Sequence, residues 1–260
     1  MISGRKIRAG AASGKAIVCS TPLSFLGGVD PATGRILDCE CESKGQSVAG
    51  KVLCFPYGKG STVGSYSMYQ LKLNGLAPCA ILNSSAEPIV ATGAIMSEIP
   101  MMDGIDIALL RPLDEVSVDA TEGTVELPHV AEKHVVTSIV RSKGKLLLLQ
   151  RSNSVGSYRG QWAGVSGFIE PHEPDLVAAK RELEEEIGVA DAKLTRKLDP
   201  ARFRDGDVVW CVHPFLFELK GRSIRIDWEH RSYEWVSPED IAKYPTVPGL
   251  QKLVGLLLGP

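Results

Sequence analysis

The sequence lacks long apolar runs and an excess of charge of either sign. No apolar run approaches the ~18 residues that a membrane-spanning helix requires. There are 29 lysines and arginines against 31 aspartates and glutamates, so no overall positive field attracts nucleic acid. The opening stretch MISGRKIRAGAASGKA contains no apolar segment of the kind found in a secretory signal. We therefore expect a cytoplasmic protein with neither a nucleic-acid nor a membrane partner.

Cysteine is too sparse for a fold that depends on disulfides, with six in 260 residues. Cys54 and Cys211 lie in strand-like apolar runs, where a free cysteine is usually a small core residue. Cys39 and Cys41 form one C-x-C pair without a second pair or a nearby histidine, which disfavours a zinc site there. We expect buried or incidental thiols.

The composition present is that of a soluble globular chain, with 44% hydrophobic and 23% charged residues, long enough for two ordinary domains. The first part is rich in glycine, serine and alanine, and a helix is expected over residues 62–73. Its short β-like runs are KAIVCS, RILDCE, KVLCFP, CAILNS and VSVDA. Because the pattern changes near Pro128, we predict two mixed α/β domains, residues 1–128 and 129–260.

The second part opens with a predicted β-hairpin. The runs HVVTSIV and KLLLLQ are joined at Ser142-Lys143-Gly144. A glycine-rich stretch, an acidic helix and the strand VVWCVHPFLFEL follow, and a closing helix is expected after Ser237-Pro238.

The acidic helix lies within GFIEPHEPDLVAAKRELEEEIGV, residues 167–189. Pro174 and Asp175 favour a helix start, and Gly188 favours the left-handed residue at its end. The apolar positions at helical spacing, which mark a buried face, are Leu176, Ala179, Leu183 and Ile187.

Three carboxylates of this helix, Glu182, Glu185 and Glu186, fall within a sector of about 100° beside that face. A charge run is often only a solvated helix surface, and Glu184 fits that interpretation. Like charges gathered at the edge of a packed face are unfavourable unless a cation offsets them. Oxygen ligands without histidine or cysteine favour Mg²⁺ or Mn²⁺, which would bridge a diphosphate.

The same stretch resembles the Nudix box, G-x5-E-x7-R-E-U-x-E-E-x-G-U with U aliphatic. Its defined positions here are Gly167, Glu173, Arg181, Glu182, Leu183, Glu185, Glu186, Gly188 and Val189. The resemblance implies an αβα sandwich with a mixed sheet. It also implies Mg²⁺-dependent hydrolysis of a diphosphate linked to another group.

By position, the resemblance implies that Glu182, Glu185 and Glu186 bind the metal and that Arg181 orients these carboxylates. Glu182 is also a candidate general base, and Glu229 is the alternative.

Two further residues of the box face the expected substrate. The resemblance implies that Gly167 and Glu173 lie at the substrate, and the alternative for Glu173 is a role as a loop-fixing partner of Arg181. Many family members read P-G-G where this chain reads Val165-Ser166-Gly167. A domain that only senses its ligand is disfavoured because the box is complete.

A second stretch that could take part in chemistry is FPYGKGSTVGS, residues 55–65. It is not a phosphate-binding Walker loop, because Lys59 is followed by glycine. One interpretation is a tight turn with Ser61 as a helix N-cap. The other is an anion site in which backbone N–H groups stabilise a deprotonated serine.

This stretch and its surroundings resemble the small subunit of aconitase X, a family that includes archaeal phosphomevalonate dehydratase. The matching segments are STPLSFLGGVDPATG, GQSVAGKVLCFPYGKGSTVGSY, GLAPCAIL and ATGAIMSEIPMMDG. The resemblance implies an aconitase-like swivelling β/β/α domain. It also implies Ser61 as the proton-abstracting base, with Gly60 and Thr62 at the substrate; many members have a second serine at the position of Thr62.

In that family the iron–sulfur cluster belongs to a separate large subunit. The resemblance therefore implies an aconitase X type large subunit as partner, and dehydration in the archaeal-type mevalonate pathway only with that partner. The alternative is a binding module that delivers a phosphorylated substrate or partner to the hydrolase.

Overall fold

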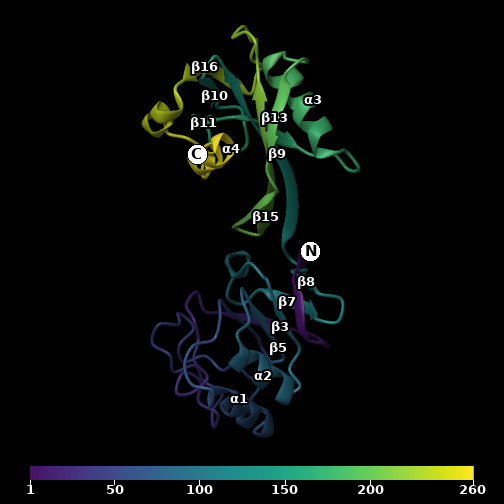
Figure 1. Cartoon of the computed structure of the whole chain (residues 1–260), viewed down its shortest axis with the longest axis vertical. Helices are drawn as coiled ribbons and strands as arrows, with labels where there is room; N and C mark the ends of the chain where they lie inside the picture. The colour runs from purple at the N-terminus through teal and green to yellow at the C-terminus, as the bar shows by residue number, and fades with distance from the viewer. Residues whose placement is uncertain (260) are drawn as a thin grey trace. The chain divides into compact units, whose positions relative to one another are not determined.

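The computed structural model describes residues 1–259, which divide into two units (Figure 1). Unit 1 comprises Met1–Glu132 and the short segment Phe203–Val209. Unit 2 comprises Lys133–Arg202 and the residues from Trp210 onward. No helix in the described residues is both long and apolar enough to cross a membrane.

Unit 1 contains one sheet, two α-helices and one 3₁₀ turn. Its strands are β1 (Ile2–Ser3), β2 (Arg5–Arg8), β3 (Ala11–Val18), β4 (Val52–Phe55), β5 (Ala80–Asn83), β6 (Met101–Asp103), β7 (Glu115–Asp119) and β8 (Thr124–Glu126). Its helices are α1 (Gly64–Leu73), α2 (Pro88–Met96) and the 3₁₀ helix η1 (Ile107–Leu109).

The sheet of unit 1 is mixed, in the order β1-β8-β7-β3-β4-β5-β6-β2. Strands β3, β4, β5 and β6 run parallel, and β7, β8, β1 and β2 add antiparallel flanks. The central strands are apolar on both faces, as expected of a sheet covered on both sides. Helices α1 and α2 pack together over one face through Met68, Leu71, Val90 and Ala94. This arrangement confirms the β/β/α expectation.

Two details of unit 1 differ from the sequence expectations. The run RILDCE forms only isolated bridges, at Arg35 and Ile36, because positive-φ glycines on both sides keep the segment in turns. Cys41 is joined to Cys19 in a disulfide, so the interpretation of Cys41 as an incidental thiol is wrong. Cys54 is buried and Cys39 is an exposed thiol.

Unit 2 is built around a second sheet, whose strands β9, β14 and β15 extend into the segments assigned to unit 1. The strands are β9 (Ala131–Ser142), β10 (Lys145–Arg151), β11 (Trp162–Ala163), β12 (Val165–Phe168), β13 (Lys193–Lys197), β14 (Ala201–Asp205), β15 (Val208–Glu218) and β16 (His230–Val236). The helices are α3 (Asp175–Ile187), the 3₁₀ helix η2 (Pro238–Lys243) and α4 (Leu250–Leu258).

The predicted hairpin joins β9 and β10 through Lys143 and Gly144, with φ values of 48° and 76°. Two positive φ angles in a two-residue loop match the twist of an antiparallel pair. Strand β15 is the neighbour of β9 on its other side. The Leu219 N–H donates to Arg141 O at one end and the Ala131 N–H to Asp207 O at the other, so β9 and β15 run parallel and the sheet is mixed.

Helices cover both faces of this sheet (Figure 1). Helix α3 packs on one face through Ala179, Leu183 and Ile187, and α4 packs on the other through Val254 and Leu257. This confirms the αβα sandwich. The closing helix is split into η2 and α4, because prolines interrupt residues 244–249 and prevent continuous helical hydrogen bonding.

Candidate functional site

Helix α3 begins and ends at the residues that the sequence indicates. Pro174 is extended and precedes the first helical residue, Asp175. Gly188 adopts the left-handed conformation with φ 69°, and its N–H donates to Glu184 O. Val189 then packs back into the core, so the register of the helix is fixed at both ends.

Arg181 lies at the centre of the carboxylates of this helix. Its guanidinium makes a two-point contact with Glu173, at 3.0 Å on each side, and donates to the Phe168 carbonyl at 2.9 Å. It also donates to Glu182 Oε1 at 2.7 Å and to Glu185 Oε2 at 3.1 Å. The hydrogen bonds from Arg181 lower the pKa of Glu173. Glu173 is therefore held as a loop-fixing partner of Arg181, and its predicted substrate contact stays a prediction.

Gly167 lies against the carboxylate of Glu182. A Cβ at Gly167 would overlap both oxygens of that carboxylate, which explains why glycine is needed at this strand position. Burial raises the pKa of Glu182, and the nearby charges of Glu185 and Glu229 act in the same direction, against the opposing effect of Arg181.

Glu186 is the most deeply buried of the three carboxylates, with 3% of its surface exposed. The Ser166 N–H donates to its Oε1 at 3.2 Å, whereas Oε2 has no hydrogen-bond partner among the described residues. Burial raises the pKa of Glu186 well above its usual range, and repulsion from Glu182 adds to this effect. The buried acceptor without a partner is the kind of group that a bound cation satisfies.

Sequence reasoning missed two residues that surround Glu186. His230 is buried, with Nε2 3.7 Å from Glu186 Oε2 and Nδ1 3.1 Å from Asp227 Oδ1. Burial lowers the pKa of His230. Asp227 also donates its N–H to the Glu186 carbonyl. Neither residue belongs to a recognisable sequence motif, because only the turn of the chain after β15 brings them to α3.

The residues on α3 fit a hard divalent cation by their chemistry. Glu185 is exposed, whereas Glu182 and Glu186 are buried, and Glu229 raises the pKa of both buried carboxyls through its charge. Oxygen donors of this kind suit Mg²⁺ or Mn²⁺. In residues 1–259 the three glutamates do not form a group with all ligand oxygens within 4.8 Å of one another, since Arg181 lies between Glu182 and Glu185.

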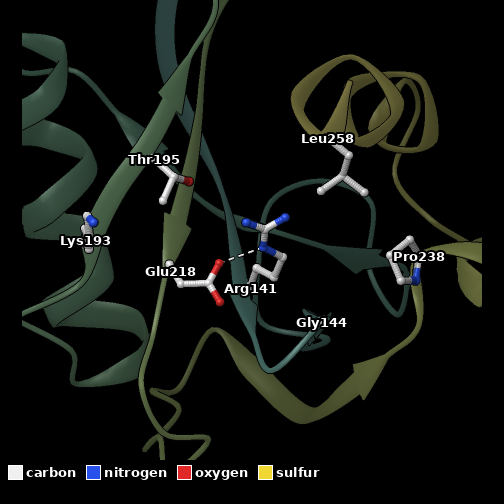
Figure 2. Close-up of a pocket in the computed structure, with 7 residues that line it drawn as sticks. All are labelled: Arg141, Gly144, Lys193, Thr195, Glu218, Pro238 and Leu258. Carbon is white, nitrogen blue, oxygen red and sulfur yellow. Dashed lines mark hydrogen bonds and ion pairs between the residues drawn. The ribbon is translucent and has the colours of Figure 1, made fainter. Parts of the chain in front are cut away.

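Unit 2 also contains a surface depression of about 560 Å³ elsewhere on the sheet (Figure 2). It contains the 2.6 Å ion pair between Arg141 and Glu218. The residues that line it are Arg141, Gly144, Lys193, Thr195, Glu218, Pro238 and Leu258. None of these is a predicted site residue. We therefore place the candidate site at α3.

The loop of unit 1 that contains Ser61 is exposed. Gly60 has φ 103°, a conformation that favours glycine. The Val63 N–H donates to Ser61 Oγ at 3.3 Å. The N-cap of α1 is Val63, without a side-chain cap bond, so the interpretation of Ser61 as N-cap is wrong. The neighbouring Thr62 is also exposed, and its carbonyl accepts from Ser65.

Apolar side chains are unusually exposed in the segments around this loop. Their exposed fractions are 46% for Leu26, 49% for Tyr57, 48% for Val63 and 66% for Tyr66. A Cβ at Gly64 would lie 3.7 Å from Leu26 N, which places Leu26 next to the start of α1. Exposed apolar groups gathered beside a polar loop are typical of an interaction surface.

The structure defines a fusion of two domains, a β/β/α domain followed by an αβα sandwich whose helix α3 carries the glutamates. Comparison with protein families gives the same result. Residues 1–127 match the aconitase X swivel domain, and residues 132–257 match the NUDIX domain. The chain belongs to the aconitase X swivel family through its first part and carries a Nudix domain in its second.

Several individual proteins are similar to parts of this chain. The phosphomevalonate dehydratase small subunit of Thermococcus onnurineus is 60% identical over 126 residues, covering 48% of this chain and 97% of that protein. The crystal structure of Thermococcus kodakaraensis aconitase X in its holo-form is 58% identical, with TM-score 0.48, covering 48% of this chain and 96% of that one. The MutT protein of Methanosarcina mazei Go1 is 23% identical, with TM-score 0.44, covering 48% and 91%.

Proposed function

We propose that unit 2 hydrolyses a diphosphate linked to another group, with Mg²⁺ or Mn²⁺ bound by Glu182, Glu185 and Glu186. The observation that carries this proposal is Glu186, a buried carboxylate with one unsatisfied oxygen beside a second buried carboxylate. When bound, the metal would neutralise charge on the phosphate oxygens.

The chain's own residues supply the positions and the proton acceptor. Arg181 holds Glu182 and Glu185 and fixes the preceding loop through Glu173. Glu182 is the candidate base, because its raised pKa brings proton acceptance closer to neutral pH. Glu229 is the alternative base, and Glu229→Gln separates the two: an unchanged kcat in that variant assigns the role to Glu182.

The test uses a panel of diphosphate compounds such as ADP-ribose and dinucleoside polyphosphates, assayed with Mg²⁺ and with EDTA. Glu185→Gln and Glu186→Gln should each lower kcat on the order of 10²-fold or more. Glu184→Gln is the matched control, because Glu184 is exposed on the same helix. Full hydrolysis in EDTA, or equal losses in Glu184→Gln, contradicts the proposal.

We further propose that unit 1 forms half of a dehydratase active site. Three features support this: an exposed Ser61 loop, the exposed apolar residues beside it, and relatives named as small subunits. In this proposal Ser61 accepts the proton, and Gly60 and Thr62 contact the substrate. A serine hydroxyl needs a dry, donor-rich pocket to act as a base, and an exposed loop supplies only one wall of it.

An iron–sulfur cluster does not fit the cysteines of this chain. The cysteines of residues 1–259 outside the disulfide are Cys39, Cys54, Cys79 and Cys211, and they form no three-cysteine group. In this proposal the cluster belongs to an aconitase X type large subunit.

The isolated chain is expected not to dehydrate 5-phosphomevalonate, and the mixture with a cluster-loaded large subunit is expected to do so. Ser61→Ala should abolish dehydration while the two subunits still associate by size-exclusion chromatography. If the mixture associates but never dehydrates, the binding-module alternative is favoured. Dehydration by the isolated chain contradicts the two-subunit proposal.

A further inference from the structure

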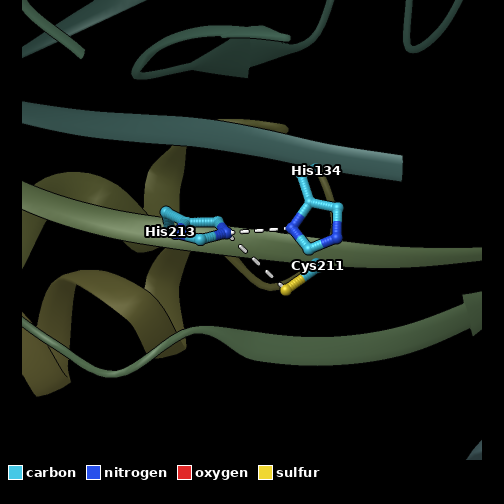
Figure 3. A group of neighbouring side chains, drawn as sticks. All are labelled: His134, Cys211 and His213. Atoms are coloured by element: carbon cyan, nitrogen blue, oxygen red, sulfur yellow. Dashed lines mark hydrogen bonds between the residues drawn. The ribbon is translucent and has the colours of Figure 1, made fainter. Parts of the chain in front are cut away.

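Three potential metal ligands lie close together on the strands of the unit 2 sheet (Figure 3). They are His134 on β9 and Cys211 and His213 on β15. One ligand atom of each lies within 4.8 Å of the others, and among residues 1–259 this is the group of three that meets that limit. Cys211 is buried, His213 is half-buried and His134 is exposed.

The strand geometry explains why these side chains meet. Cys211 and His213 are two positions apart on one strand, so both project from the same face. Phe215 and Phe217 continue that face into the core beneath α3, and Val136 continues the face of His134 in the same way. Because β9 and β15 are neighbours, His134 lies beside the Cys-x-His pair.

A carboxylate determines which nitrogen of His213 faces the group. His213 Nδ1 lies 2.9 Å from Asp175 Oδ2, and Lys197 Nζ lies 2.7 Å from the same oxygen. A carboxylate paired with a lysine only accepts hydrogen bonds, so Nδ1 carries the proton and the Nε2 lone pair faces Cys211 and His134. Carboxylate–histidine pairs of this kind orient metal-bound imidazoles.

Two separations within the group are close to those expected around a shared tetrahedral ion. His134 Nδ1 lies 3.2 Å from His213 Nε2, and Cys211 Sγ lies 3.7 Å from the same nitrogen. Zinc bonds of about 2.0–2.1 Å to nitrogen and about 2.3 Å to sulfur at tetrahedral angles give nitrogen–nitrogen separations of about 3.4 Å and nitrogen–sulfur separations of about 3.6 Å. These two separations lie within about 0.2 Å of the calculated values.

We propose that His134 Nδ1, Cys211 Sγ and His213 Nε2 form a binding site for Zn²⁺ with a fourth position open to water. Binding converts the Cys211 thiol to a thiolate, so one proton is released to solvent for that ligand. The thiolate offsets one of the two charges of the ion, and the Asp175 carboxylate, which is also paired with Lys197, holds His213 in place. Nitrogen and sulfur ligands select zinc over magnesium, whereas the glutamates of α3 have the opposite preference.

The site connects two strands with the first residue of the helix that carries the glutamates. Asp175 and Glu182 are seven residues apart, or about 10 Å along the helix axis. Zinc should therefore stabilise unit 2 without forming part of the hydrolytic centre.

The test uses tag-free, full-length protein that has been stripped of metal with a chelator. The protein is returned to excess Mg²⁺, which occupies the oxygen-ligand site, and its uptake of zinc is then measured. We expect one zinc per chain by elemental analysis, and a rise in the unfolding temperature of unit 2 on the order of 5 °C. Cys211→Ser, His213→Ala and His134→Ala should each weaken zinc binding at least 100-fold in a competition titration with a chromophoric chelator. Asp175→Asn should weaken it about 10- to 100-fold.

Matched controls use a cysteine and a histidine outside the group. Cys39→Ser and His129→Ala should bind zinc as the wild type does, since both residues lie in unit 1. Substitution with Co²⁺ adds a second readout, a thiolate-to-cobalt charge-transfer band that Cys211→Ser removes. Because His134 is exposed, His134→Ala tests the site even if Cys211→Ser fails to fold. No zinc uptake above the Mg²⁺ control, or equal uptake by the wild type and His134→Ala, overturns the proposal.

Discussion

At the scale of single residues, the absence of a side chain at Gly167 makes room for the Glu182 carboxylate. Gly167→Ala should displace that carboxylate and lower kcat for diphosphate hydrolysis on the order of 10²-fold, because small misplacements of catalytic groups have effects of this size. Gly156→Ala is the control, since a Cβ there contacts nothing within 4 Å. Equal kinetics for Gly167→Ala and the wild type would show that Glu182 need not occupy its observed position.

The stability of unit 1 depends on pH through Asp103. Arg5 donates to both oxygens of its carboxylate, at 2.9 and 2.6 Å, and these bonds lower the pKa of Asp103. A lowered folded-state pKa contributes stability that is present above the unfolded value of about 3.9 and is lost as the pH falls through the folded value. Asp103→Asn should lower the unfolding temperature of unit 1 by a few degrees at pH 7 and reduce this acid-dependent loss, as measured by calorimetry between pH 2 and 7. An identical acid-dependent loss in the variant would contradict the assignment.

The residues of the two candidate metal sites differ in how far the sequence predicts them. The box glutamates and Arg181 lie within one helix, so helical spacing alone places them on a common side. His134 and Cys211 are 77 positions apart, as their numbers show, and only the pairing of β9 with β15 brings them together. Cys211 was correctly expected to be buried, but its neighbour across the sheet could not be predicted.

At the scale of elements, the turn between β9 and β10 depends on Gly144. Its φ of 76° is unfavourable for other residues, so Gly144→Ala should destabilise unit 2 by about 1 kcal/mol. Gly255→Ala within α4 is the contrasting change and should stabilise by about 0.5–1 kcal/mol, because a Cβ there meets open space. Urea titration followed by circular dichroism measures both. The prediction fails if the two variants shift stability in the same direction.

Elements with strong local sequence patterns could be predicted. Elements whose ends are set by neighbouring turns could not. Strands β4, β5 and β7 and helix α3 follow from apolar runs bounded by turn residues. RILDCE has a strand-like composition, but it forms no strand because its neighbouring glycines adopt positive φ. The start of α1 at Gly64 rather than after Ser61 reflects turn bonds from Gly64 and Ser65 to Ser61 and Thr62, which propensity does not reveal.

At the scale of the whole molecule, the short segment Phe203–Val209 belongs to unit 1 although it follows most of unit 2 in the chain. Within unit 1 the Arg204 side chain is 2% exposed and pairs with Asp114 at 3.2 Å, and Val209 is part of the buried core. The change in sequence pattern near Pro128 gives no indication of this segment. The boundary at Pro128 remains a prediction.

The fragment 129–260 contains every residue of the Nudix box and both strands of the proposed zinc site. We expect it to fold and to hydrolyse diphosphates at a rate close to that of the full chain. The fragment 1–128 lacks Arg204 and Val209 and should unfold at a lower temperature than unit 1 of the full chain. Circular dichroism melts and kcat measurements test both statements. A fragment 129–260 without helical signal would show that the hydrolase domain does not fold independently.

We propose that this one chain carries two chemically independent sites, and a crossed assay separates them. Ser61→Ala and Glu186→Gln are each mixed with a cluster-loaded large subunit, and dehydration of 5-phosphomevalonate and hydrolysis of diphosphate compounds are measured on the same samples. We predict that Ser61→Ala eliminates dehydration and leaves hydrolysis at the wild-type rate, while Glu186→Gln does the reverse. Loss of both activities in either variant, or of neither in both, would show that the two sites are not independent.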